Sequence, residues 1–152
     1  MANPAAEGET GTPFVLDVER GKIREFADAT RSRNPSYWDE ERPVVPPTFL
    51  TTQMFWEKWA GKDANPWHLV ELDQVRGMHA EQEYVFYGEP PRAGTQLTAQ
   101  SRIGEIYEKA GRDGVLTFAV MITEFRDETG RLVAEARLTG VEAPAPAGEA
   151  AP

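Results

Sequence analysis

The segment from Thr48 to Ala60, TFLTTQMFWEKWA, constrains the fold more than any other part of this chain. Two prolines, Pro46 and Pro47, precede it, and proline is well suited to the first turn of a helix. Gly61 follows it, at a position where glycine commonly ends a helix. Large apolar side chains cover most of the helix circumference, namely Phe49, Leu50, Met54, Phe55, Trp56 and Trp59. A helix that is apolar nearly all round is a buried helix, so we predict that it lies at the centre of the fold.

The second half of the chain is rich in β-branched and aromatic residues and predicts four strands. These strands cover residues 82–87, 95–108, 115–126 and 131–141. Their connections are short and turn-like, with the sequences GEPPRAG, KAGRDG and DETG. Successive strands joined in this way form an antiparallel meander. Strands of this length can curl, and the buried helix is the element they would wrap.

The N-terminal part predicts one short strand and one further helix. Residues Phe14 to Glu19 alternate apolar and polar side chains, which is typical of a strand. Residues Arg20 to Thr30 place Ile23 and Phe26 on one helical face. The Asn34-Pro35 pair is a turn signal that stops this helix.

Both ends of the chain differ in composition from the middle. Residues 1–12 are small and polar without periodicity, and we expect them to be disordered. Residues 143–152 are rich in Ala and Pro and predict a tail, or a linker to a further domain. Between them, residues 13–142 predict a single α+β domain in which a curled antiparallel sheet wraps a central buried helix.

Charge and composition exclude several classes of function. The net charge of -9 argues against nucleic acid as a general partner. Cysteine is absent, which excludes disulfides, thiolate metal sites and a cysteine nucleophile, and two histidines far apart make no convincing metal site. No apolar stretch approaches membrane-spanning length, and residues 1–11 lack the basic start and apolar run of a signal peptide. We therefore expect a cytoplasmic protein with no membrane partner.

The loop from Ser32 to Asp39, SRNPSYWD, resembles a known catalytic loop. Hydration of an enoyl thioester needs a carboxylate and an imidazole within reach of one water. In the MaoC-like, (R)-specific hydratase and dehydratase family, this pair lies in the pattern D-x-N-P-x-H. Asn34 and Pro35 fall on the Asn-Pro, whereas Ser32 stands at the Asp position and Tyr37 at the His position. Serine is no base near neutral pH, and tyrosine is a far weaker acid than an imidazolium. We therefore predict no catalytic residue in this loop.

The resemblance extends over roughly Phe14 to Glu142. It is carried by the segments KIREFADATRSRNPSYWDE, VVPPTFL, HAEQEYVFYGEPPRAGTQLTA and TGRLVAEARLTGV. These are similar to the N-terminal, FAS1-like dehydratase relative of MaoC domains. The resemblance implies a single hot-dog domain.

The family also implies a function for a chain without the acid/base pair. In this family a degenerate half commonly pairs with a catalytic half, and the acyl-thioester tunnel runs at their junction. The resemblance thus implies a non-catalytic, substrate-shaping subunit of a heteromeric (R)-specific enoyl-CoA hydratase or 3-hydroxyacyl-thioester dehydratase. Its partner would be a catalytic MaoC-like subunit, in a heterodimer or heterotetramer. The substrate would be an acyl-CoA or an acyl carrier protein thioester, with a bulky acyl group such as a steroid side chain, and no cofactor would be needed.

The expected substrate-binding residues are Asn34, Tyr37, Trp38, Pro47, Thr48 and His79. Each also has a structural interpretation. Tyr37 and Trp38 either line the tunnel or pack the loop onto the sheet, and Asn34 holds the turn. In the family, backbone N–H groups near Pro47 and Thr48 face the thioester carbonyl, but these residues also simply start the helix.

Two other functions remain open at the level of sequence. One is a homodimeric hot-dog thioesterase or hydratase that uses His79 with Glu81 or Asp39. Strand alternation would put His79, Glu81 and Glu83 on one face. The other is a non-enzymatic module that binds or scaffolds an acyl thioester.

Overall fold

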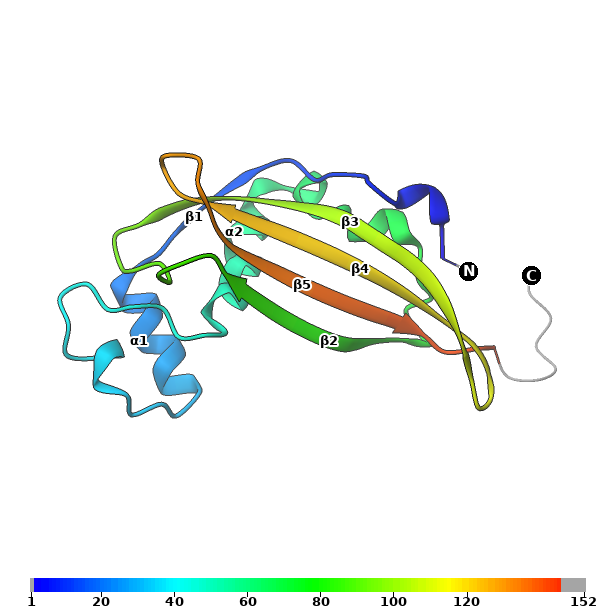
Figure 1. Cartoon of the computed structure of the whole chain (residues 1–152), viewed down its shortest axis with the longest axis horizontal. Coiled ribbons are helices and arrows are strands. Elements are labelled where there is room, and N and C mark those ends of the chain that lie inside the picture. Colours follow the sequence, from blue (N-terminus) through cyan, green and yellow to red (C-terminus); the bar gives the residue numbers. More distant parts are fainter. Residues whose placement is uncertain (1, 146–152) are drawn as a thin grey trace.

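A five-stranded antiparallel sheet with the strand order β1-β3-β4-β5-β2 forms the body of the molecule. The computed structural model describes residues 2–145 (Figure 1). The strands are β1 (Phe14–Asp17), β2 (Gly77–Phe86), β3 (Gln96–Gly111), β4 (Gly114–Arg126) and β5 (Leu132–Glu142). The helices are α1 (Arg20–Ala29), α2 (Gln53–Ala60) and the short 3-10 helices η1 (Pro4–Ala6), η2 (Pro35–Tyr37), η3 (Phe49–Thr52), η4 (Lys62–Ala64) and η5 (Pro66–Val70).

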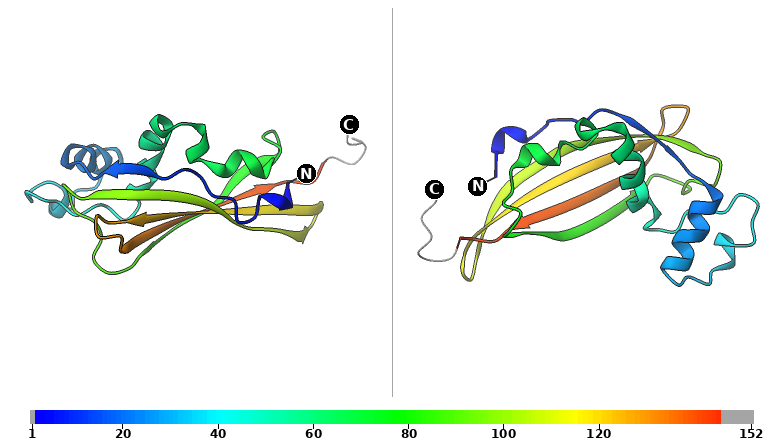
Figure 2. Two further views of the ribbon diagram at one scale, coloured as in Figure 1. Left: turned by 90° about the horizontal axis from the view of Figure 1, so that it is seen from above. Right: turned by 180° about the vertical axis from the view of Figure 1, so that it is seen from behind.

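The sheet curls, and α2, η4 and η5 lie over one of its faces (Figure 2). Alternation along β4 identifies this covered, concave face, because Met121, Thr123 and Phe125 are buried while Val120 and Ile122 are only half-buried. Register shifts in β2 and β3 mark irregularities of the kind that bend strands. The predicted α+β domain with a curled antiparallel sheet is confirmed.

The position of β2 differs from the prediction. A meander would have paired β2 with β3, but β2 pairs with β5, with Tyr84 opposite Ala136. The connection from β2 to β3 lies against an earlier segment of the chain, where Val45 N donates to Pro91 O over 3.0 Å. Because this connection has backbone partners of its own, it can run past the end of the sheet instead of closing a hairpin. β2 also begins earlier than predicted, at Gly77, since residues 77–81 carry no regular alternation.

The central helix differs in two respects from the prediction of one helix buried all round. Its first turn, η3, is a 3-10 helix whose Phe49 and Leu50 are fully buried. In α2, however, Met54 and Phe55 are exposed, and Trp59 is 85% exposed. A single curled sheet covers only one side of a helix, so the outer apolar side of α2 stays uncovered by the residues that the structure describes.

The N-terminal segment also differs from the prediction of disorder. Residues 2–12 run beside β3, where Gly8 N donates to Ile103 O over 2.9 Å and Ile103 N donates to Glu9 O over 2.8 Å. The side chains of Ala2 and Ala6 are buried in a small apolar cluster. This segment continues the cover that β1 gives to the edge of β3. Backbone hydrogen bonds hold it, which is why a side-chain pattern did not reveal it.

The main core lies between the concave face, α1 and η3. Phe26 of α1 meets Phe49 of η3 edge to face, with ring centroids 5.7 Å apart. Among residues 2–145, no helix is both long and apolar enough to cross a membrane. The predicted tail, residues 143–152, lies outside the described part of the chain except for residues 143–145.

Candidate functional site

The loop that resembles a catalytic loop is held by its own hydrogen bonds. The Asn34 side chain accepts from Ser36 N over 3.1 Å and so caps η2. Trp38 Nε1 donates to Ser32 O over 3.2 Å. Arg24 of α1 donates from its guanidinium to Trp38 O over 2.6 Å. Asn34 therefore holds the turn, as its structural interpretation predicts, and Trp38 ties the loop to itself.

The two positions that carry the acid/base pair in the MaoC-like pattern have different surroundings here. Tyr37 is only 9% exposed and belongs to the main core cluster, which also contains Phe49. Ser32 instead lines an open surface hollow of about 530 Å³, together with Trp38 and Asp39. A proton relay needs both groups on one water, and these two side chains lie in separate environments.

The start of the central helix, where the sequence predicts a contact with a thioester carbonyl, has two backbone N–H groups that are already paired. Pro47 and Thr48 are exposed. The N–H of Phe49 donates to Pro46 O, and the N–H of Thr51 donates to Thr48 O. These two donors are therefore occupied within the chain, which fits helix initiation.

His79 lies in β2 beside an irregularity that the sequence did not reveal. The register of β2 shifts between His79 and Glu81, so that His79 pairs with Gly140 and Glu81 pairs with the adjacent Thr139 of β5. Neighbouring residues of a strand point to opposite faces, so His79 and Glu81 do too, and the predicted shared face is wrong. The imidazole Nε2 of His79 lies 3.0 Å from the carbonyl oxygen of Glu81, a backbone contact. Asp39 follows η2, which lies beside α1 at the far end of the sheet from the start of β2 (Figure 1).

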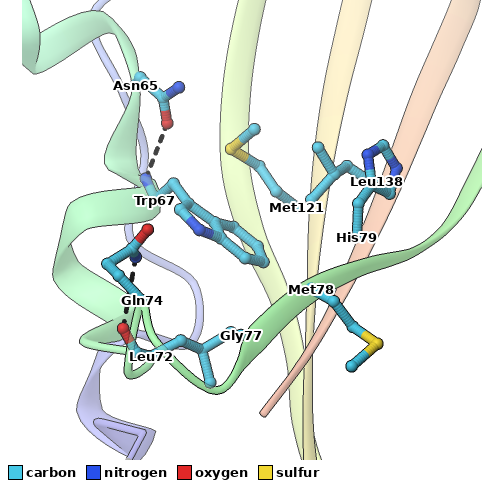
Figure 3. A pocket seen from close by; sticks show the side chains of 10 residues that line it. Asn65, Trp67, Leu72, Gln74, Gly77, Met78, His79, Met121 and Leu138 are labelled. Atoms are coloured by element: carbon cyan, nitrogen blue, oxygen red, sulfur yellow. Dashed lines mark hydrogen bonds between the residues drawn. The ribbon is translucent and has the colours of Figure 1, made fainter.

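His79 does line a groove along the concave face. One part of the groove, about 240 Å³, lies between α2 and the sheet. The other part, about 270 Å³, lies between η5 and the sheet, where the Trp67 ring is directed toward Met121 (Figure 3). The two parts share four lining residues, Asn65, His79, Met121 and Leu138. The two parts therefore adjoin each other along β2, and together they are called the groove.

Trp67 closes the η5 end of this groove against β5. Its backbone N donates to the Asn65 side-chain oxygen over 2.9 Å, so Asn65 begins η5 (Figure 3). A Cβ placed on Gly140 would lie 2.6 Å from the Trp67 ring, which shows that the ring rests directly on the strand backbone. Glycine at position 140 is thus what allows the indole to form this wall.

A buried polar cluster lies at the α2 end of the groove, and the sequence predictions missed it. Glu57 of α2 is only 8% exposed, and its Oε1 has no hydrogen-bond partner among the described residues. Burial raises the pKa of the Glu57 carboxyl, and a hydrogen bond with the Asn65 side chain offsets part of that rise. Gln53 Oε1 is also buried without a partner in residues 2–145, and Gln53 lines the same part of the groove. The spacing of Gln53 and Glu57 by four residues places them on one helical face, which is the signal the sequence did contain.

The wall opposite this cluster is a hydroxyl pair on the sheet. Gln53 Nε2 donates to Thr123 Oγ1 over 3.4 Å, a weak contact. The hydroxyls of Thr123 and Ser101 lie 2.8 Å apart and satisfy each other. Tyr84 of β2 also lines the groove, and burial raises the pKa of its phenol. The α2 part of the groove therefore combines many hydrogen-bonding side chains with a few apolar ones, such as Met54, Met121 and Leu138. A ligand with both apolar and polar groups suits such a lining.

Comparison with known proteins adds relatives at two levels. A UPF0336 protein of Streptomyces coelicolor is 39% identical over 105 residues, covering 64% of this chain and 67% of the relative. A UPF0336 protein of Streptomyces avermitilis is 38% identical over 128 residues, covering 79% of this chain and 80% of the relative.

Solved structures match the fold over nearly the whole chain. The HadBC (3R-hydroxyacyl-ACP dehydratase) complex of Mycobacterium tuberculosis aligns with a TM-score of 0.69 at 23% identity, covering 90% of this chain and 96% of the other. The ChsH1-ChsH2 complex of the same organism aligns with a TM-score of 0.67 at 17% identity, covering 98% of this chain and 92% of the other. At these identities the likeness establishes the fold, which is the hot-dog fold of MaoC-like dehydratases.

The family model for the FAS1-like dehydratase domain region matches residues 5–136. This range includes the Asn34-Pro35 turn, α2 and the strands up to the middle of β5. This chain belongs to the FAS1-like dehydratase domain family and has the hot-dog fold.

Proposed function

We propose that this chain is the non-catalytic, substrate-shaping subunit of a heteromeric (R)-specific enoyl-thioester hydratase or dehydratase. The observation that carries the proposal is the loop at residues 32–39. It keeps the Asn34 turn, but Tyr37 stands at the imidazole position and packs in the core. The loop thus has a structural role in this chain, and the proton chemistry belongs to a MaoC-like partner that carries D-x-N-P-x-H.

The longer of the two edge strands, β2, supports a partner on its side of the sheet. Residues 2–12 and β1 cover the edge of β3. β2 pairs only with β5 within the described chain, and its residues 77–83 are exposed. An uncovered strand edge is a ready template for pairing with another chain. A partner strand at β2 would extend the sheet and lie directly beside the groove, whose wall is β2.

The groove supports an acyl thioester as the ligand of the complex. Its walls include Met121 and Leu138, and its two parts follow the concave face from α2 to η5. In the proposed complex, the thioester of CoA or acyl carrier protein lies at the partner's acid/base pair, and the acyl group extends into this groove. A bulky acyl group such as a steroid side chain is the class we favour. We propose a heterodimer or heterotetramer that acts in the cytoplasm without a cofactor.

Co-expression with a MaoC-like subunit tests this function. We expect the complex to hydrate trans-2-enoyl-CoA thioesters of long or bulky acyl groups, while this chain alone shows no hydration. Hydration by the isolated chain would contradict the proposal. A stable complex that binds acyl-CoA but never hydrates it would instead support the scaffolding module.

A further inference from the structure

The polar cluster on α2, formed by Gln53 and Glu57, lies in the wall of the groove that the proposed function assigns to the acyl group. Glu57 lines this groove together with Met54, Met121 and Leu138, and its Oε1 is buried. A buried polar atom without a hydrogen bond costs roughly 1–3 kcal/mol, and such atoms are rare in native proteins. A groove that served only an alkyl chain would gain stability from an apolar residue at position 57. The carboxyl therefore needs an explanation beyond packing.

Two unpartnered side-chain oxygens on one face of α2 belong to residues that line the groove. Gln53 Oε1 and Glu57 Oε1 both lack a hydrogen-bond partner among residues 2–145. Glu57 is 8% exposed, so nearly all of its surface is inside the protein. The hydroxyl pair of Ser101 and Thr123 across from them is already satisfied. The unmet hydrogen-bonding capacity thus lies on the helix side of the groove.

We propose that Glu57, assisted by Gln53 and Asn65, recognises an oxygen-bearing group, a hydroxyl or a ketone, on the acyl chain of the substrate. A hydroxyl can donate to the Glu57 carboxylate or to Gln53 Oε1, and a ketone can accept from a protonated Glu57. The raised pKa of the carboxyl favours the protonated form that a ketone requires. This inference rests on the proposed function for the acyl thioester, and it names the substrate class as acyl thioesters that carry a hydroxyl or a ketone beyond the reacting carbons 2 and 3.

Binding to the full-length chain tests the recognition directly. The probes are dodecanoyl-CoA and a series of its derivatives, each with one hydroxyl or one ketone at a successive carbon beyond carbon 3, and binding is measured by calorimetry. We expect at least one oxygenated derivative to bind about tenfold more tightly than dodecanoyl-CoA itself, which is the gain from one well-made hydrogen bond. Glu57→Leu should reduce this preference to within about twofold, because it removes the hydrogen-bonding group and keeps the volume.

Two variants separate recognition from effects on folding. Glu57→Gln keeps a neutral hydrogen-bonding group and should keep part of the preference for the hydroxyl. Glu108→Leu changes an exposed glutamate of β3 and should leave the preference unchanged. The inference is overturned if no oxygenated derivative binds more tightly than dodecanoyl-CoA, or if Glu57→Leu keeps the full preference. In either case the cluster binds water only.

The same series on the complex with a MaoC-like subunit distinguishes this inference from the proposed function. If the complex hydrates all substrates without a preference for oxygenated acyl groups, measured as the ratio of kcat/KM values, the inference is wrong and the proposed function holds. If the complex prefers oxygenated acyl groups in binding but hydrates none of them, the inference holds and the proposed function is wrong. No measurable binding of any probe, to the chain or to the complex, overturns the inference.

Discussion

At the residue scale, the burial of Glu57 links the proton affinity of its carboxyl to the stability of the fold. The pKa of this group is raised above its ordinary value of 4.5 because burial disfavours the charged form. The Glu57 carboxyl therefore loses its proton at a lower pH in the unfolded chain than in the folded chain. The contribution of Glu57 to stability is fully present below pH 4.5 and is lost as the pH rises through the raised pKa.

A neutral substitution at position 57 should therefore be stabilising at neutral pH. We expect Glu57→Gln to raise the free energy of unfolding at pH 8 by about 1 kcal/mol and to have little effect at pH 4. Urea unfolding at both pH values measures the difference from the wild type, in which contributions of other carboxyls cancel. Glu105→Gln, at an exposed position of β3, is the control and should shift neither curve. An equal effect of Glu57→Gln at both pH values would refute the linkage.

Tyr37 gives a second prediction at this scale. Restoring the family pattern with Ser32→Asp and Tyr37→His should not make the isolated chain a hydratase, because position 37 packs in the core. The imidazole should instead lower the free energy of unfolding by about 2 kcal/mol or more through lost packing and a buried polar ring. Tyr37→Phe is the matched control and should stay close to the wild type. The measurements are trans-2-enoyl-CoA hydration and urea unfolding, and hydration by the double variant would disprove the placement.

At the scale of elements, strand and helix types followed from side-chain patterns, whereas pairing did not. The alternation in β4 and the turn chemistry between β3, β4 and β5 predicted these three strands and their order. The sequence predicts that β2 starts at Gln82 and pairs with β3. The pairing differs because the pattern of side chains in one strand does not specify which strand lies beside it. The irregularity at His79 is likewise invisible in the sequence, so the predicted shared face with Glu81 was wrong.

The N-terminal segment yields a prediction that separates an ordered element from a loose end. Ala5 is exposed, whereas Ala6 is 1% exposed and packs against β3 and η5. We expect Ala6→Lys to lower the free energy of unfolding by about 2 kcal/mol or more, since a charge would enter an apolar cluster. Ala5→Lys should change it by less than about 0.5 kcal/mol. Equal small effects in thermal or urea unfolding would mean that residues 2–12 contribute nothing to stability.

At the scale of the whole molecule, the two edge strands of the sheet differ in length, because β1 covers four residues and β2 covers ten. The edge at β2 adjoins the groove and carries Met78, which is 61% exposed. The opposite edge carries Val15 of β1, which is 47% exposed. A partner that extends the sheet at β2 would contact the first of these residues and not the second.

This asymmetry predicts the effect of a matched pair of substitutions. Met78→Lys should weaken the complex with the MaoC-like subunit about tenfold or more, because it places a charge in the proposed interface. Val15→Lys should leave the affinity unchanged, and both variants should stay folded because both side chains are exposed. Affinity is measured by titration of the purified subunits. A weaker complex with Val15→Lys alone would move the interface to the β1 side.

Local side-chain patterns were enough to specify the local structure of this protein. The periodicity of apolar residues predicted the helices and the long strands. The loop sequence showed the Asn34 turn and the missing acid/base pair, and the motifs identified the family. These features depend on residues close together in the chain, so the pattern of side chains suffices to specify them.

Which neighbour packs against each face of an element depends instead on contacts between distant parts of the chain. In the folded chain the outer side of α2 is exposed and residues 2–12 lie along β3. β2 is an edge strand of the sheet, and Tyr37 is buried in the core. The fold also brings Glu57 and Asn65 together with Met121 of β4 in one groove. Such contacts join residues far apart in sequence, and their energies depend on packing, backbone pairing and exclusion of water, which no local pattern encodes.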